Sequence, residues 1–210
     1  MSPRPYNLGK RQAQISHGRR QILDAARGLL AEATSYRDFT VDAVARRAGV
    51  VRATVYYQFK SKPGLLEAVC DDLAEVGGLA DLAGAFTEAE AGLAWRRFVE
   101  VFGRFWDADR AAMRRLRALA QLDPEVAGVI AARDQRRRQG IEVLLGRLLD
   151  GSVGGAAPEA IARRLHALTS FETFDTLAGR DRSLTDVVPE VVEMTEAVLR
   201  PAATTSQASS

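Results

Sequence analysis

Residues 39–62 constrain the fold of this chain more than any other stretch, because they encode two short helices joined by a tight turn. Thr40 stands where a helix N-cap is expected, with a hydroxyl that can accept an unpaired backbone N–H. Apolar residues then recur at helical spacing up to Ala48. Gly49 follows at the position where a helix ends in a left-handed residue, which glycine adopts without steric strain. The pattern predicts a helix over residues 41–48 that ends in a glycine turn.

The second helix of this stretch is predicted over residues 52–58. Val55 and Phe59 are four residues apart and are expected to face inward. The residues that remain on the outer face can all form hydrogen bonds: Arg52, Thr54, Tyr56, Tyr57 and Gln58. A short helix with a polar outer face, held by another helix and a glycine turn, is typical of a helix-turn-helix that reads DNA.

The charge of the chain is unevenly distributed, although its net value is only +2 over 210 residues. Residues 1–62 contain twelve Lys/Arg and four Asp/Glu, a net charge of +8, and the rest of the chain carries −6. A basic N-terminal third joined to an acidic remainder indicates a polyanionic partner for the first part only.

Several classes of protein are disfavoured by what the sequence lacks. The single cysteine, Cys70, excludes an intrachain disulfide and is interpreted as a small buried residue of a helix. His and Cys residues do not gather at zinc-site spacing, and we expect neither a metal nor another cofactor. The basic N-terminus has no apolar core of a signal peptide, and no apolar run reaches the 18 residues of a membrane span. We therefore expect a cytoplasmic protein with no membrane partner.

The chain divides into four predicted parts, and its regular structure is expected to be all-α. Residues 1–15 form a flexible basic arm, which either is a disordered tail or reaches along DNA with Arg4, Lys10 and Arg11. Residues 16–62 form a three-helix DNA-binding domain, whose first helix covers 16–33. Residues 63–201 form a second helical domain, and residues 202–210 a disordered Ala/Thr/Ser tail. The helices expected in the second domain cover about 88–107, 109–121, 124–149, 158–179 and 184–199, after a linking helix near 65–80.

Ordered pieces of the helix-turn-helix stretch resemble the TetR family of bacterial transcriptional regulators. They are Phe39-Thr40-Val41, Ala45-Arg-Arg-Ala48-Gly49-Val50, Thr54-Val55-Tyr56-Tyr57-Gln58-Phe59, and Lys60-Ser61-Lys62 before Leu65-Leu66. The resemblance covers about 50 residues and beyond them extends only to length and helical character. It implies a homodimer with a three-helix DNA-binding domain and a C-terminal domain that binds a small ligand. It also implies that the chain dimerises through the helices at about 158–179 and 184–200.

Two positions depart from the family's pattern. Val51 stands where Ser or Thr often caps the recognition helix, so capping of about 1 kcal/mol is lost and a phosphate contact is in doubt. Pro63-Gly64 follows Lys62 where the family commonly has Glu, and Gly64 weakens the start of the next helix by roughly 1 kcal/mol.

The predicted DNA-binding residues divide by the chemistry of their side chains. The family resemblance implies backbone contacts for Thr40, Tyr57 and Lys62. Arg52 is the best candidate to read a base, because its guanidinium can pair with both acceptors of guanine, and the alternative is a phosphate contact or a solvated charge. Ala53 permits a close approach to a thymine methyl group, and Thr54, Tyr56 and Gln58 are expected to contact bases or phosphates.

A set of large apolar residues is the candidate lining of a ligand pocket in the second domain. The pocket itself is implied by the resemblance, and ordinary core packing is the alternative for each residue. The set is Trp95, Phe98, Phe102, Phe105, Trp106, Met113, Leu116, Phe171 and Phe174. His166 is interpreted as a core or interface histidine rather than a ligand contact.

The sequence thus predicts a dimeric regulator that binds double-stranded DNA and is not an enzyme, since no catalytic spacing stands out. We expect a repressor that a small apolar or aromatic ligand releases from a near-palindromic operator. Two alternatives stay open: a ligand-independent DNA-organising protein, and a helical small-molecule-binding protein with a vestigial DNA reader.

Overall fold

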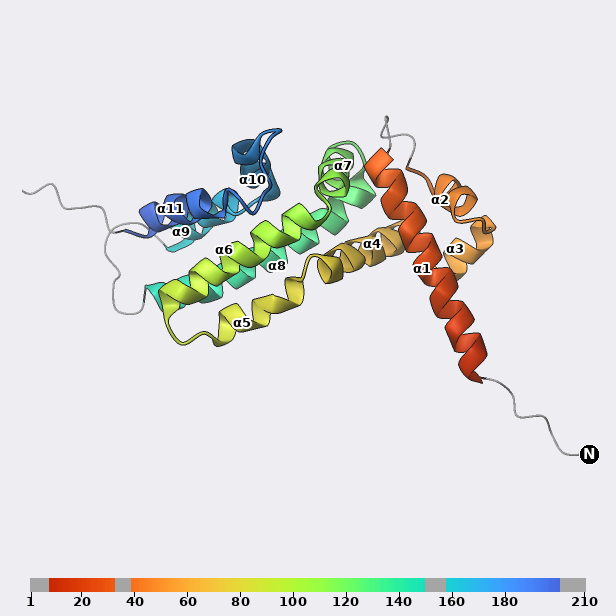
Figure 1. Cartoon of the computed structure of the whole chain (residues 1–210), viewed down its shortest axis with the longest axis horizontal. Helices are drawn as coiled ribbons and strands as arrows, with labels where there is room; N and C mark the ends of the chain where they lie inside the picture. The colour runs from red at the N-terminus through yellow and green to blue at the C-terminus, as the bar shows by residue number, and fades with distance from the viewer. Residues whose placement is uncertain (1–7, 33–38, 150–157, 201–210) are drawn as a thin grey trace, which may run out of the picture. The chain divides into compact units, whose positions relative to one another are not determined.

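The computed structural model describes residues 8–32, 39–149 and 158–200. Every regular element in these ranges is helical, which confirms the all-α prediction (Figure 1). The chain forms two compact units, and both are discontinuous in sequence. The first unit contains residues 1–73 and 110–131, and the second contains residues 74–109 and 132–210.

The first unit is built on the long helix α1 (Leu8–Glu32), against which α2 (Val41–Arg47) and α3 (Arg52–Phe59) pack. It also contains most of α4 (Lys62–Val76), all of α7 (Arg110–Ala120) and the start of α8 (Pro124–Leu148). Helix α7 packs against α1. Ile22, Ala26 and Leu30 of α1 are fully buried, as their helical spacing predicts.

A buried carboxylate joins α1 to α4 within this unit. Asp72 is almost fully buried on α4, and its two oxygens accept hydrogen bonds from Arg20 at 2.5 Å and Arg27 at 2.9 Å. A buried charge is tolerated when opposite charges and hydrogen bonds satisfy it, as they do here. Two of the basic residues of α1 therefore act within the fold.

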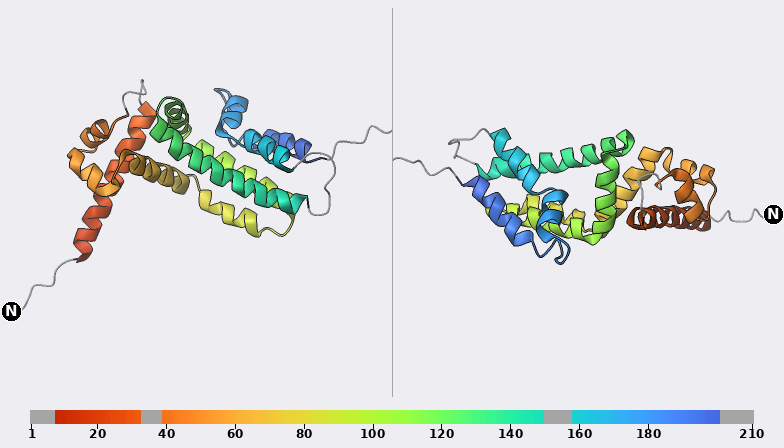
Figure 2. Two further views of the ribbon diagram at one scale, coloured as in Figure 1. Left: turned by 180° about the vertical axis from the view of Figure 1, so that it is seen from behind. Right: turned by 90° about the horizontal axis from the view of Figure 1, so that it is seen from above.

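The second unit is a set of helices around an aromatic core. Helix α5 (Leu82–Thr87), after the short 3₁₀ helix η2 (Leu79–Asp81), packs along α6 (Ala91–Ala108). Helix α11 (Val188–Leu199) packs against α6 and α9 (Pro158–Leu168), and α10 (Phe171–Ala178) contacts both α6 and α9 (Figure 2). The rings of Trp95 and Phe98 stack with centroids 5.5 Å apart, and further ring contacts continue along α6 to Trp106 and Phe171.

Helix α5 was not predicted, and helix boundaries differ most from the sequence predictions at four places. Helix α1 begins at Leu8 rather than at residue 16, because good helix formers extend it through part of the predicted arm. The predicted helix 158–179 is broken into two, since Ser170 caps α10 by accepting from the Thr173 N–H. Helix α4 ends at Val76, where Gly78 follows with a left-handed φ of 68°.

The fourth difference lies before α11, which begins at Val188 rather than near residue 184. Ser183 and Asp186 form reciprocal capping bonds, with the Ser183 N–H donating to the Asp186 carboxylate and the Asp186 N–H donating to the Ser183 hydroxyl. They close a turn that precedes the helix. The sequence prediction therefore places the start of this helix one turn too early.

The compact units also cut the chain differently from the predicted domains 16–62 and 63–201. Residues 110–131 belong with the N-terminal helices, and the predicted tail 202–210 lies outside the described residues, as does the arm up to residue 7. The first unit carries sixteen Lys/Arg and nine Asp/Glu, a net charge of +7, so the second carries −5. The charge asymmetry seen in the sequence is retained by the folded units.

Candidate DNA-binding surface and ligand pocket

Helix α2 is fixed at its start by a side-chain cap. The Thr40 Oγ1 accepts a hydrogen bond from the Ala43 N–H at 3.1 Å, as the sequence predicts. Val41, Val44 and Ala45 are buried, so the helix faces the core with one apolar side. Thr40 itself is exposed. The start of α2 therefore presents the positive end of a helix to solvent, where a phosphate can bind.

The turn after α2 is closed by a Schellman motif. Gly49 has a left-handed φ of 66°, and its N–H donates to the carbonyl of Arg46. The Val50 N–H donates to the carbonyl of Ala45 at 3.0 Å. These bonds fix the direction in which the chain enters α3, so the predicted role of Gly49 is confirmed.

Helix α3 has a buried side and a polar outer side. Val55 and Phe59 are buried, as predicted, and Arg52, Ala53 and Tyr57 are exposed. Thr54, Tyr56 and Gln58 are half-buried at the edge of the outer face. Val51 takes the extended N-cap conformation but makes no side-chain cap bond, in agreement with its apolar side chain. Six of the eight predicted DNA-binding residues thus lie on this one short helix, and none of the six is buried.

Arg52 is held by partners on two helices. Its Nη1 donates to both carboxylate oxygens of Asp42 on α2, at 2.9 and 3.2 Å, and its Nη2 donates to the Tyr56 hydroxyl at 3.2 Å. The Tyr56 hydroxyl and the Asp42 charge raise the pKa of Arg52. Asp42 was not among the residues singled out from the sequence. It orients the guanidinium at the surface of α3, where a base-reading residue must lie.

The connection from α3 to α4 is a close turn. Lys60 has a positive φ of 69°, and the Ser61 Oγ accepts from the Gly64 N–H at 3.1 Å, so Ser61 caps α4. A Cβ on Gly64 would lie 2.1 Å from the carbonyl oxygen of Phe59. Glycine at this position is therefore required by the close approach of two backbones, which the sequence could suggest only as a weakness of the helix.

Lys62 lies half-buried in the first turn of α4. Its ammonium group is ion-paired with Asp123, just before α8. The family resemblance implies a contact between Lys62 and the DNA backbone, and nothing in the sequence indicates that Lys62 meets Asp123.

The nine predicted pocket residues occupy the cores of both units. Met113 and Leu116 are buried on α7 in the first unit. In the second unit Trp95, Phe98, Phe102, Trp106, Phe171 and Phe174 are buried, and Phe105 is half-buried. The Trp95 Nε1 donates to the Thr195 hydroxyl at 3.0 Å, so the indole is satisfied within the fold.

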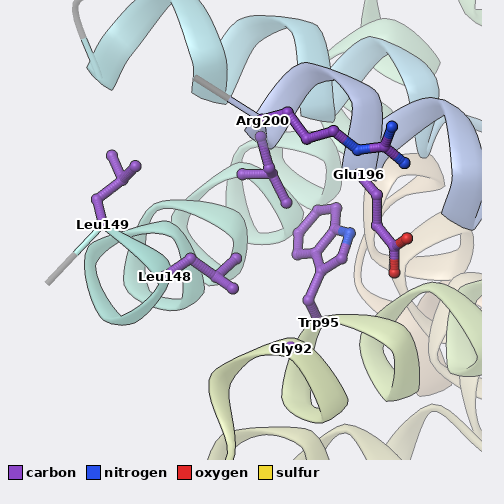
Figure 3. A pocket seen from close by; sticks show the side chains of 7 residues that line it. Gly92, Trp95, Leu148, Leu149, Glu196 and Arg200 are labelled. Carbon is purple, nitrogen blue, oxygen red and sulfur yellow. The ribbon is translucent and has the colours of Figure 1, made fainter. Parts of the chain in front are cut away.

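A pocket of about 390 Å³ lies at one end of the second unit, and Trp95 is the only one of the nine residues that lines it. Figure 3 shows the indole between the leucines at the end of α8 and the side chains of α11. The other lining residues are Gly92, Leu148, Leu149, Glu196, Leu199 and Arg200. Sequence reasoning missed these six, because they come from three segments far apart in the chain.

A buried arginine organises another part of the second unit. Arg137 on α8 donates to the His166 carbonyl and the Thr169 hydroxyl, both at 2.7 Å. His166 is half-buried, and its Nε2 lies 3.1 Å from the Asp134 carbonyl. Burial, together with the nearby charge of Arg137, lowers the pKa of His166. This geometry agrees with a core histidine. None of the described His, Cys, Asp and Glu residues cluster as metal ligands would.

The helix-turn-helix region matches a known protein family. Residues 22–69, which include the capped α2, the glycine turn and α3, match the model of the bacterial regulatory proteins of the tetR family. A search of curated proteins found no match to this sequence. Helices long and apolar enough to cross a membrane are absent from the described part of the chain.

Solved structures extend the likeness to nearly the full chain. The secondary repressor NalD of the Pseudomonas aeruginosa MexAB-OprM efflux pump superposes with a TM-score of 0.68 at 19% identity, covering 87% of this chain and 95% of that one. A transcriptional regulator from Saccharomonospora viridis in complex with choline gives 0.63 at 22%, covering 86% and 96%. The Bacillus subtilis regulator FadR in complex with stearoyl-CoA gives 0.65 at 16%, covering 84% and 96%. The chain is a helix-turn-helix protein with the fold of the TetR family of transcriptional regulators.

Proposed function

We propose that this protein is a homodimeric, sequence-specific repressor that a small apolar or aromatic ligand releases from a near-palindromic operator. The observation that carries the DNA-binding part is the outer face of α3, where Arg52 is exposed and oriented by Asp42 and Tyr56. A guanidinium fixed at the surface of a short helix suits the two acceptors of guanine in the major groove. Because this unit carries a net charge of +7, it also suits the phosphate backbone.

The positions of the candidate DNA-binding residues suggest which would contact bases and which would contact the DNA backbone. Arg52 would read a base, and Ala53 would allow a thymine methyl to approach. Thr40 and Lys62 lie at the starts of α2 and α4, where backbone N–H groups favour phosphates, and the exposed hydroxyl of Tyr57 would add a further backbone contact. Two-fold symmetry would place two such units on half-sites about one helical turn apart.

The ligand part of the proposal is supported by the pocket beside Trp95. Its volume lies within the range of small-molecule sites, and Leu148, Leu149 and Leu199 make most of its wall apolar. Glu196, which pairs with Arg96 at 2.7 Å, and Arg200 provide the polar groups of its lining. Structures of similar fold hold ligands as different as choline and stearoyl-CoA. The proposed apolar or aromatic ligand therefore rests on the residues that line this chain's own pocket.

The DNA-binding proposal is tested with the purified protein and a pool of random-sequence duplexes. We expect selection to yield a two-fold symmetric consensus, and Arg52→Ala to lower affinity for it by about 1–3 kcal/mol while relaxing one base position in each half-site. Gel shifts on matched and mismatched duplexes measure both effects. An equal loss on both duplexes would contradict base reading by Arg52, and selection without a consensus would favour a DNA-organising protein.

The ligand proposal is tested by fluorescence. In the Trp106→Phe variant Trp95 is the single tryptophan, so a compound that enters the pocket should change its emission. Small aromatic and aliphatic compounds that do so should also reduce DNA binding, because a released repressor requires different ligand affinities in the two states. Compounds that change the emission of Trp95 and leave DNA affinity unchanged would contradict control through this pocket.

A further inference from the structure

Lys62 has a partner in the folded protein that resembles a phosphate in charge and in hydrogen-bonding chemistry. Its Nζ donates to the Asp123 Oδ2, and the Glu125 carboxylate lies 3.8 Å away. The side chains of Lys62 and Asp123 are 26% and 27% exposed, so the pair is partly shielded from solvent. A pair in this position interacts more strongly than a fully exposed one.

The carboxylate of Asp123 is held in place by a helix start. Its Oδ1 accepts from the backbone N–H of Glu125 at 2.9 Å and of Val126 at 3.4 Å, which makes it the cap of α8. The hydrogen bond from Lys62 and those from the backbone lower the pKa of Asp123, so the group stays ionised at neutral pH. One oxygen thus caps α8, while the other binds the lysine.

The same ammonium cannot serve Asp123 and a DNA phosphate without a cost. A phosphate that approaches Lys62 also approaches the negative charges of Asp123 and Glu125, and like charges at short range repel. An isolated lysine at the start of a helix is disfavoured by the helix dipole, so an anion beside it is stabilising. In the free protein that anion is Asp123, and on DNA it would be a phosphate.

We propose that Asp123 is a positioning residue that competes with DNA phosphate for Lys62, so that the start of α8 sets how strongly the protein holds DNA. The inference rests on the proposed DNA-binding function and adds a way to regulate it. Helix α8 begins in the first unit and continues past Ala131 into the second. A shift at the start of this helix would tighten or loosen the Lys62–Asp123 pair, and thereby change DNA affinity.

The competition is tested with Asp123→Asn, which removes the charge and keeps an oxygen that can cap α8. Affinity is measured over a range of salt concentrations, on a duplex selected from a random pool by the wild-type protein and on an unselected duplex. We expect Asp123→Asn to raise affinity for both duplexes by about two- to fivefold, from the usual strength of such pairs. Because the gain comes from a phosphate contact, affinity should also fall more steeply with salt.

Three further variants separate competition from other effects. In a Lys62→Ala background, Asp123→Asn should give a clearly smaller gain, since only the direct repulsion between the Asp123 carboxylate and phosphate is then relieved. Glu125→Gln, at the longer distance, should give a smaller gain than Asp123→Asn. Asp123→Ala also loses the cap, so its unfolding free energy relative to Asp123→Asn shows whether the cap is retained in the asparagine variant.

The outcomes distinguish this inference from the function on which it rests. Unchanged or weakened DNA binding by Asp123→Asn, or an equal gain in the Lys62→Ala background, would overturn the competition and leave DNA binding intact. A wild-type protein that binds no duplex at low salt would overturn both.

Discussion

The sequence predicts binding residues on the outer face of α3 and on the inner face of α6, and the two faces differ in their exposure to solvent. On α3 the predicted residues other than Ala53 are polar, and each of them is exposed or half-buried. On α6 they are apolar, and Trp95, Phe98 and Phe102 are buried against one another. The first face is available to a partner, whereas the second is mostly occupied by its own neighbours.

This difference in exposure shows which sequence patterns can identify a binding site. A polar residue on the outer side of an amphipathic helix contributes little to the core, so its chemistry indicates a partner. An apolar residue at helical spacing is expected in any helical core, and periodicity cannot separate a pocket wall from packing. Of the nine apolar residues, only Trp95 borders the pocket as the structure has it.

The largest expected effect tests whether the α6 face is core. Trp95 is 1% exposed, stacks on Phe98 and donates to Thr195, so Trp95→Ala should lower the free energy of unfolding by about 3–5 kcal/mol. Urea denaturation followed by circular dichroism measures the change. Trp95→Phe, which keeps an aromatic ring, should lose markedly less.

Leu93 provides the matched control on the same helix. Its side chain is 53% exposed, so Leu93→Ala should change the free energy of unfolding by less than about 0.5 kcal/mol. If Trp95→Ala cost no more than Leu93→Ala, the indole would be a loosely held pocket wall. The contrast between the two faces would then fail.

The helix-turn-helix could be predicted almost entirely, because its signals are local. The cap at Thr40, the left-handed Gly49 and the inward Val55 each depend on a few neighbouring residues, and the structure has them as expected. The second unit depends on contacts between distant segments. Local patterns therefore predict most of its helices, but neither α5 nor the break at Ser170. The pocket beside Trp95 includes six residues that no local pattern indicates.

The first unit also contains ion pairs that local sequence patterns could not reveal. Asp42 and Arg52 lie on different helices, and Lys62 and Asp123 are 61 positions apart. Opposite charges are common enough along this chain that proximity in space cannot be inferred from composition. The charge of a site can be predicted from sequence, whereas the pairing within it requires the fold.

Gly64 offers a second test, in which local and tertiary effects have opposite signs. Helix propensity alone predicts that Gly64→Ala stabilises the protein by up to about 1 kcal/mol. Because the new Cβ would lie 2.1 Å from the Phe59 carbonyl oxygen, we expect a loss of about 1–3 kcal/mol instead. Thermal and urea unfolding measure the sign directly.

Gly128 is the control for this substitution, since it lies on α8 in the same unit with no atom near its prospective Cβ. Gly128→Ala should stabilise the protein by about 0.4–1 kcal/mol. A gain for both alanine variants would mean that the close turn between α3 and α4 relaxes easily. The position of Lys62 would then be less firmly set than the structure indicates.

The smallest expected effect concerns the missing cap of the recognition helix. Val51 is 69% exposed and has the extended backbone of an N-cap, so Val51→Ser removes no core packing and adds a hydroxyl that can accept an N–H of α3. The free energy of unfolding should rise by about 0.5–1 kcal/mol, and Thr40→Ala, which removes the cap of α2, should lower it by a similar amount. Opposite changes of equal size would mean that both helices respond to capping alike. The natural chain would then lack a stabilising cap at α3, the helix whose outer face carries Arg52. Its residue at position 51 would be explained by DNA binding rather than by stability.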